Sequence, residues 1–146
     1  MATLRRRAAR LAFVPPVLLY MILAELTVRS VPVQRLSKVF GVPLDSTSVH
    51  AIPNHQPPSL TRWQRGQLRT LAPLAARWPF ADGPCLRQSL VTGHVLRRHH
   101  PVLRLGVANP DSGLQAHAWV EVDGFPLGES SAFTPLINVR APSIDQ

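Results

Sequence analysis

Asp82-Gly83-Pro84-Cys85-Leu86-Arg87-Gln88-Ser89-Leu90 predicts the start of a helix, and the rest of the chain is interpreted around it. Asp82 can cap the helix, Gly83 turns the chain, and Pro84 suits the first helical position. Cys85, the single cysteine, then lies in the first turn. Unpaired backbone N–H groups and the helix dipole favour a thiolate there.

A second stretch, Ala116-His117-Ala118-Trp119-Val120-Glu121-Val122-Asp123-Gly124, predicts a strand that ends in a hairpin turn. Apolar and larger polar or aromatic side chains alternate along it, so one face is apolar: Ala118, Val120 and Val122. The Asp-Gly pair is a strong hairpin signal. A thiol on a helix start and a histidine on a later strand are the groups that nucleophilic catalysis needs, once helix and sheet bring them together.

These motifs, with Gly106-Val107 and Pro126-Leu127-Gly128-Glu129, resemble one family, the leader peptidases of lasso-peptide biosynthesis. That family consists of transglutaminase-like, papain-like cysteine proteases, and the resemblance spans residues 80–131. It implies Cys85 as nucleophile, His117 as base and Glu129 as the acid that orients the base. Glu129 stands where the family often has Asp, and Gln88 stands where it usually has Arg.

The resemblance implies a cysteine peptidase that removes the leader peptide from a ribosomally made lasso precursor, without a cofactor. A separate macrolactam cyclase would then close the ring. The first 45 residues have the pattern of helices and basic charge, so we expect a separate leader-recognition protein. Two alternatives stay open: a transglutaminase-like acyl transferase, and a non-catalytic peptide-binding or membrane-associated scaffold with an inert thiol.

Composition limits the class of protein and its partners. The chain has 146 residues, of which 45% are hydrophobic, so a single folded domain is expected. The net charge of +8 indicates either a solvated, arginine-biased surface or a basic groove that attracts an acidic leader peptide. No nucleic-acid module is present, so no nucleic-acid partner is expected. One cysteine excludes an internal disulfide, and we expect a cytoplasmic location.

The order of patterns predicts an α+β fold. A helical N-terminal segment (1–45) and a Pro-rich linker or loop (46–59) precede a transglutaminase-like, papain-like core (60–146) with a small antiparallel sheet, all in one compact domain. The apolar run 11–24 is interrupted by Pro15-Pro16, ends at Glu25 and is too short to cross a bilayer. We expect a helix over 17–29 that packs on the domain or a partner, with peripheral membrane contact as a second hypothesis.

The remaining elements follow from hydrophobic periodicity. Further helices are expected over 31–42, 60–77 and 84–98, and strands over 102–107, 115–122 and 125–129. The expected buried positions of the three helices are Val33, Leu36, Val39 and Phe40; Leu60, Trp63, Gln67, Leu68, Leu71 and Leu74; and Leu86, Leu90, Gly93 and Leu96.

Strand parity constrains the acid. Glu129 lies directly opposite His117 only if the register is shifted by one residue from that of a two-residue Asp123-Gly124 loop, in which His117 faces Ser130. We therefore predict a longer loop, 122–125, or an equivalent bulge that makes this shift. Glu121 shares the His117 face but lies about 13 Å along the strand, too far for direct contact.

Other side chains are weaker candidates for the site. Trp78 and Phe80 are placed beside the nucleophile as walls of a substrate cleft, and Trp119 as a substrate contact or a shield for the ion pair; ordinary packing is an open alternative for each. His94, His99 and His100 have no accompanying cysteine or carboxylate set, so no metal site is predicted.

Overall fold

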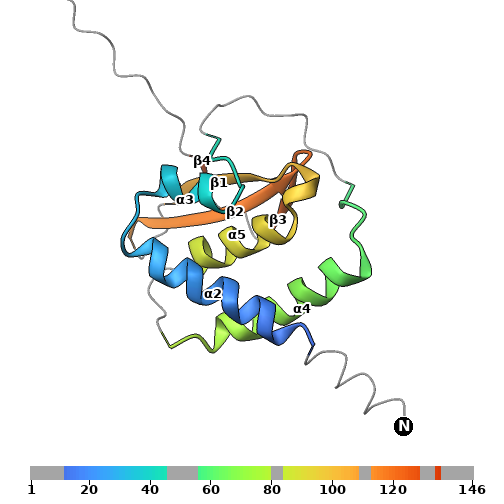
Figure 1. Ribbon diagram of the computed structural model, residues 1–146. Helices are drawn as coiled ribbons and strands as arrows, with labels where there is room; N and C mark the ends of the chain where they lie inside the picture. Colours follow the sequence, from blue (N-terminus) through green and yellow to red (C-terminus); the bar gives the residue numbers. More distant parts are fainter. Residues whose placement is uncertain (1–11, 46–55, 80–83, 109–112, 129–133, 136–146) are drawn as a thin grey trace, which may run out of the picture.

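The computed structural model describes residues 12–45, 56–79, 84–108, 113–128 and 134–135. In this part of the chain, helices precede strands (Figure 1). The helices are α2 (Val14–Val28), α3 (Val33–Val39), α4 (Arg62–Ala76), α5 (Pro84–Val95) and the short 3₁₀ helix η1 (Arg97–His99). The strands are β1 (Val102–Ala108), β2 (Gln115–Val122), β3 (Phe125–Leu127) and β4 (Thr134–Pro135). The fold is α+β, as predicted.

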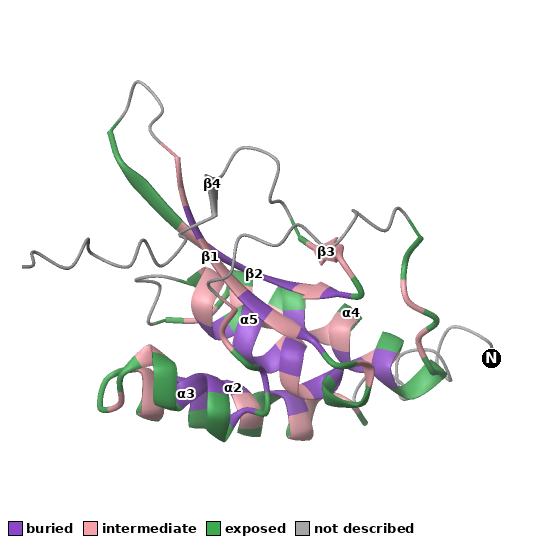
Figure 2. Ribbon diagram, turned by 90° about the horizontal axis from the view of Figure 1, so that it is seen from above, coloured by how far each residue is buried: buried purple, intermediate pink, exposed green. Residues whose placement is uncertain are grey.

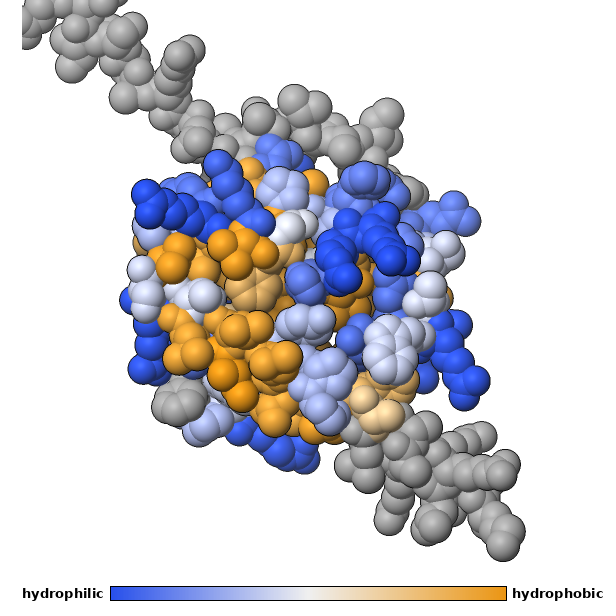
Figure 3. Space-filling model, viewed as in Figure 1, coloured by the Kyte–Doolittle hydropathy of each residue, from blue (hydrophilic) through white to orange (hydrophobic). Residues whose placement is uncertain are grey.

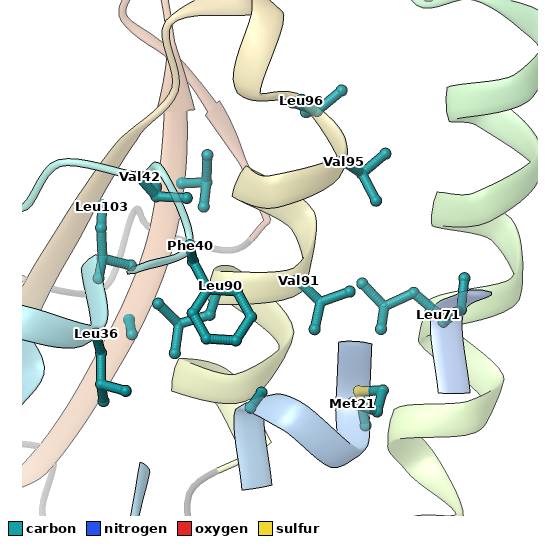
Figure 4. Packing of buried hydrophobic residues seen from close by; sticks show 14 of the residues in the cluster. Met21, Leu36, Phe40, Val42, Leu71, Leu90, Val91, Val95, Leu96 and Leu103 are labelled. Atoms are coloured by element: carbon teal, nitrogen blue, oxygen red, sulfur yellow. The ribbon is translucent and has the colours of Figure 1, made fainter. Parts of the chain in front are cut away.

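Helix α5 forms the middle layer. It packs on β2 and β1 on one side and on α2 and α4 on the other, and α2 also contacts α4 (Figures 1 and 2). Figure 4 shows Leu90 of α5 beside Phe40, and Val91 toward Leu71 of α4. Helix α4 therefore packs directly on the helix that carries Cys85.

Gly93 allows a close approach to α5. A Cβ at this position would lie 2.4 Å from Val42 Cγ2, closer than two carbon atoms can pack. The residue is buried together with Leu90 and Leu96, whereas Leu86 is half-buried. The expected helical face of α5 is confirmed, although the α-helix ends at Val95 and continues as η1.

The first two helices differ from expectation at their ends and faces. α2 begins at Val14, and Pro15 and Pro16 lie in its first turn, where a missing N–H costs no internal hydrogen bond. No helix in the described part of the chain has the length and hydrophobicity needed to cross a membrane. Leu36 and Ser37 of α3 and Phe40 at its C-cap form the buried side, whereas Val39 points away from this side and is 68% exposed.

Helix α4 starts at a capping box. The Thr61 hydroxyl accepts from the Gln64 backbone N–H, and the Gln64 side chain accepts from the Thr61 N–H. Gln64, Gln67 and Leu71 are buried. Trp63 is 54% exposed, so its predicted burial was wrong; its ring centroid lies 4.7 Å from that of Phe13.

The sheet has the order β3-β2-β1-β4, with antiparallel neighbours. β2 has the predicted bounds, and its predicted apolar face is buried against α5: Ala118, Val120 and Val122. Leu103 of β1, opposite Val120, lies in the same core, whereas Leu105 and Val107 are half-buried.

The β2–β3 hairpin is tight. Val122 pairs with Phe125, so the loop consists of Asp123 and Gly124 alone, and both have positive φ (51° and 77°). Such a loop matches the twist of the paired strands. The predicted four-residue loop is therefore wrong, and β3 ends at Leu127 instead of 129. Gly128 has φ +120°, so regular strand geometry does not extend past Leu127.

Candidate active site

Cys85 is the second residue of α5 and a free thiol. Pro84 occupies the first helical position, as predicted, so the Cys85 backbone lies in the turn whose N–H groups have no intrahelical acceptor. The side chain is half-buried and packs against the edge of the hydrophobic core. The positive end of the helix dipole therefore acts on a partly desolvated sulfur.

His117 lies on β2, directly opposite Gly106 of β1. It is half-buried, and its ring is nearly parallel to the Trp119 ring, with the centroids 6.1 Å apart and the planes at 16°. An offset parallel arrangement at this distance is favourable for aromatic rings. Trp119 therefore supports one side of the imidazole.

A buried hydrogen bond joins the two elements that carry Cys85 and His117. Ser89 Oγ donates to the Ala118 carbonyl oxygen over 2.9 Å. Ser89 lies one helical turn after Cys85 on the same face, and Ala118 directly follows His117. The bond therefore holds the first turns of α5 against the His117 end of β2, although the pairing of thiol with imidazole itself stays a prediction.

The two faces of β2 have different roles. Ala118, Val120 and Val122 point into the core beneath the sheet, whereas Trp119 is buried outside that core cluster. By strand alternation His117, Trp119 and Glu121 share this second face. His117 thus lies on the face of β2 opposite the core, together with the Trp119 ring and a polar network.

That network runs along β2 and across to β1. Trp119 Nε1 donates to Glu121 Oε1 (3.0 Å), and Arg104 Nε donates to Glu121 Oε2 (3.0 Å). Arg104 Nη1 is also 3.0 Å from Asp45 Oδ2. Glu121 is therefore engaged with Trp119 and Arg104, and the Trp119 ring that donates to it also stacks on His117. We call Trp119, Glu121, Arg104 and Asp45 the outer cluster.

A second cluster lies on the helical side, two residues after Cys85. Arg87 and Glu25 of α2 form an ion pair in which both side chains are less than 10% exposed. Glu25 also accepts from Arg29 Nε (2.8 Å) and from Trp78 Nε1 (3.3 Å). Burial raises the pKa of the Glu25 carboxyl, but the Trp78 hydrogen bond and the charges of Arg87 and Arg29 outweigh it, so the pKa lies below its ordinary value. We call these four residues the inner cluster.

Sequence reasoning did not find the inner cluster. Trp78 was expected as a wall of the substrate cleft; it is half-buried, packs on the core and donates to Glu25, and a role toward substrate stays a prediction. The available signals were Glu25 at the end of an apolar run and Arg87 between apolar neighbours in α5. Both are charges in positions that the pattern assigns to the interior.

Two predicted site residues, Glu129 and Phe80, lie outside the described residues, as do positions 46–55 of the expected Pro-rich loop. The tight hairpin lacks the one-residue shift of register that would place position 129 opposite His117. Because β3 ends at Leu127, strand parity does not exclude the acid either. Its orienting role stays a prediction.

The histidines near the end of α5 have protein partners. His94 Nδ1 is 3.2 Å from the Phe40 carbonyl oxygen, and His99 Nε2 is 3.3 Å from Gln64 Oε1. Burial lowers the pKa of His94, the Phe40 contact partly opposes this, and the charge of Arg97 lowers it further. Over the residues that the structure describes, no group of three or more histidine, cysteine and acidic side chains is arranged to hold a metal ion.

A surface hollow of about 300 Å³ lies at the other end of β2. It is lined by Gln56, Pro57, Pro58, Ser59, Val122 and Asp123. Val122 is about 17 Å from His117 along the strand, at the usual rise per residue. The hollow is therefore separate from the ends of α5 and β2 that carry Cys85 and His117.

A family model, described as the transglutaminase-like superfamily, matches residues 27–138. The match covers most of the chain and includes both Cys85 and His117, so the chain belongs to the transglutaminase-like superfamily. No curated protein and no solved structure matches it. Cysteine proteases and acyltransferase-like enzymes are common in this superfamily, and a thiol on a helix start agrees with that class.

Proposed function

We propose that this protein is a cysteine peptidase that removes the leader peptide from a ribosomally synthesised lasso-peptide precursor. Cys85 is the nucleophile, His117 the general base and acid, and Glu129 the residue that orients His117. A separate leader-recognition protein delivers the precursor, and a macrolactam cyclase acts on the released core peptide. The reaction takes place in the cytoplasm, where a lone thiol stays reduced.

One observation carries the proposal. The single cysteine of a transglutaminase-like chain lies in the first turn of α5, and Ser89 ties that helix to the strand of His117. Cys85 lies in the turn whose backbone N–H groups have no intrahelical acceptor, and its side chain is half-buried. The choice of a lasso precursor rests on the sequence motifs around Cys85 and His117.

The reaction proceeds in two steps. The Cys85 sulfur attacks the scissile carbonyl carbon, and the tetrahedral adduct collapses when His117 gives a proton to the departing amine. The C–N bond breaks and a thioester forms. Water then attacks the thioester as His117 accepts its proton, which returns to the sulfur, and the new carboxylate leaves. The Cys85 backbone N–H is one donor available to the oxyanion.

The test is mass spectrometry of a candidate precursor incubated with the protein and its recognition partner. We expect leader release by the wild type and at least a 10³-fold lower rate for Cys85→Ala and His117→Asn, because both remove a group that acts in the chemical step. His100→Asn is the matched control: His100 is exposed, and asparagine tolerates its left-handed backbone (φ 49°).

The outcomes separate the candidate functions. If Cys85→Ala releases the leader as fast as the wild type, the thiol mechanism is wrong. If the wild type instead joins the precursor to an added primary amine through the same thioester, the protein is an acyl transferase. Glu129→Ala should lower the rate less than His117→Asn does, because an orienting residue leaves the reacting groups in place.

A further inference from the structure

Helix α2 carries an exposed apolar stripe. Its members are spaced one helical turn apart on one side: Leu18 (36% exposed), Leu19 (55%), Ile22 (41%), Leu23 (42%) and Leu26 (62%). Figure 3 shows the resulting hydrophobic surface over α2, in the view of Figure 1. We call these five residues the α2 stripe.

The opposite side of α2 is already used by the fold. Val17, Met21 and Ala24 are buried in the core, and Glu25 belongs to the inner cluster. The helix is therefore apolar almost all round, a composition that normally requires burial on every side. Water covers the α2 stripe in the isolated chain, and contiguous patches of this kind mark interaction surfaces.

The charges around the stripe indicate what covers it. Residues 1–44 contain six arginines and one lysine but a single acid, Glu25, which is buried in its ion pair. Four of the arginines precede α2 in the sequence, at positions 5, 6, 7 and 10. After α2, Arg35 and Lys38 are exposed on α3, which packs on α2. The stripe is thus flanked on both sides in sequence by positive charge.

This charge pattern does not suit a second copy of the chain. Two α2 stripes facing each other would bring the same basic residues together without acids to neutralise them. An anionic lipid surface offers both components at once: hydrocarbon for the leucines and phosphate for the arginines.

We propose that α2 docks this protein on an anionic membrane surface, with the α2 stripe in the acyl boundary and Arg35 and Lys38 at the lipid phosphates. α2 then lies in the plane of the interface, as amphipathic interfacial helices do. Its core side keeps its contacts with α4 and α5. The proposal is independent of the peptidase activity, since neither Cys85 nor His117 takes part in it.

The experiment is co-sedimentation of the full chain with vesicles of equimolar phosphatidylglycerol and phosphatidylcholine, and with phosphatidylcholine alone. We expect binding to the anionic vesicles to be reduced roughly tenfold or more by Leu19→Gln/Leu26→Gln, which removes the two most exposed stripe residues. Arg35→Gln/Lys38→Gln should weaken it by about fivefold for each charge. Binding should also weaken as salt is added.

Leu114→Gln is the matched control, because Leu114 is 75% exposed but lies just before β2, away from α2. Circular dichroism melts of each variant establish that it is folded. The proposal is overturned if the wild type does not bind the anionic vesicles. It is also overturned if Leu19→Gln/Leu26→Gln binds them as well as the wild type does. A third outcome also overturns it: light scattering without lipid shows that the wild type is a dimer and that the double variant is a monomer. A second copy of the chain would then cover the α2 stripe.

Discussion

The inner and outer clusters are built from the same three kinds of side chain but lie in different environments. In each, a glutamate accepts from a tryptophan N–H and pairs with an arginine: Glu25 with Trp78 and Arg87, and Glu121 with Trp119 and Arg104. The inner pair is 6% and 9% exposed, whereas the outer pair is 11% and 21% exposed.

The difference lies in what remains when one charge is lost. Arg104 has a second carboxylate nearby, Asp45, and partial access to water. Arg87 and Glu25 form their ion pair in the interior, between α5 and α2, where both side chains are buried. A buried charge without its partner costs several kcal/mol, and an accessible one costs little. We therefore expect the inner cluster to help to hold α5 on α2, and the outer cluster to help to hold the Trp119 ring beside His117.

The largest effect is expected for Glu25→Gln. The substitution leaves the Arg87 charge buried, so we expect the free energy of unfolding to fall by about 3–5 kcal/mol. Urea denaturation measures it. Arg29→Gln is the control, since the Arg29 side chain is 62% exposed and its pair should contribute less than about 1 kcal/mol.

A double variant sharpens this first prediction. Glu25→Leu/Arg87→Met removes both charges and should regain most of the lost stability, because two apolar side chains can replace a buried ion pair. If Glu25→Gln costs no more than Arg29→Gln, the inner cluster does not hold α5 on α2.

A pH dependence follows from the same residue. The pKa of Glu25 in the folded state lies below its ordinary value of 4.5, so between the two values the unfolded chain binds more protons than the folded one. The stabilisation by Glu25 is complete above about pH 5 and is lost as the pH falls through the folded pKa. Unfolding free energies measured from pH 6 down to about pH 3 should fall more steeply for the wild type than for Glu25→Gln. Parallel curves would contradict the prediction.

A smaller effect is expected for Glu121→Gln in the outer cluster. Arg104 keeps Asp45, so we expect a loss of about 1 kcal/mol. The substitution removes the negative charge of the group that accepts from the Trp119 N–H, so this hydrogen bond is weakened. The Trp119 ring, which stacks on His117, can then change its orientation. Proton NMR of the His117 ring should then show a changed chemical shift in a protein of nearly unchanged stability. An unchanged His117 resonance would show that the outer cluster does not affect the environment of His117.

Much of the α5–β2 unit was predictable because it depends on local patterns. Alternation predicted the bounds and the buried face of β2, and Pro84 predicted the start of α5 with Cys85 in its first turn. Gly93 was among the expected buried positions, and the structure shows that Val42 approaches it closely. The hairpin prediction failed because the loop length was chosen to align Glu129 with His117; the Asp123-Gly124 pair itself favours the two-residue loop that the structure has.

The sequence by itself determined which segments are helix or strand, which of their faces are apolar, and that a thiol begins α5, because these features depend on neighbours only two to four positions apart. Tertiary structure alone decided that Arg87 pairs with Glu25, 62 positions earlier, that Arg104 joins Glu121 to Asp45, and that the α2 stripe stays exposed while the other side of the helix is buried. Several partners of opposite charge were available to each arginine, and only the path of the chain through space selects among them.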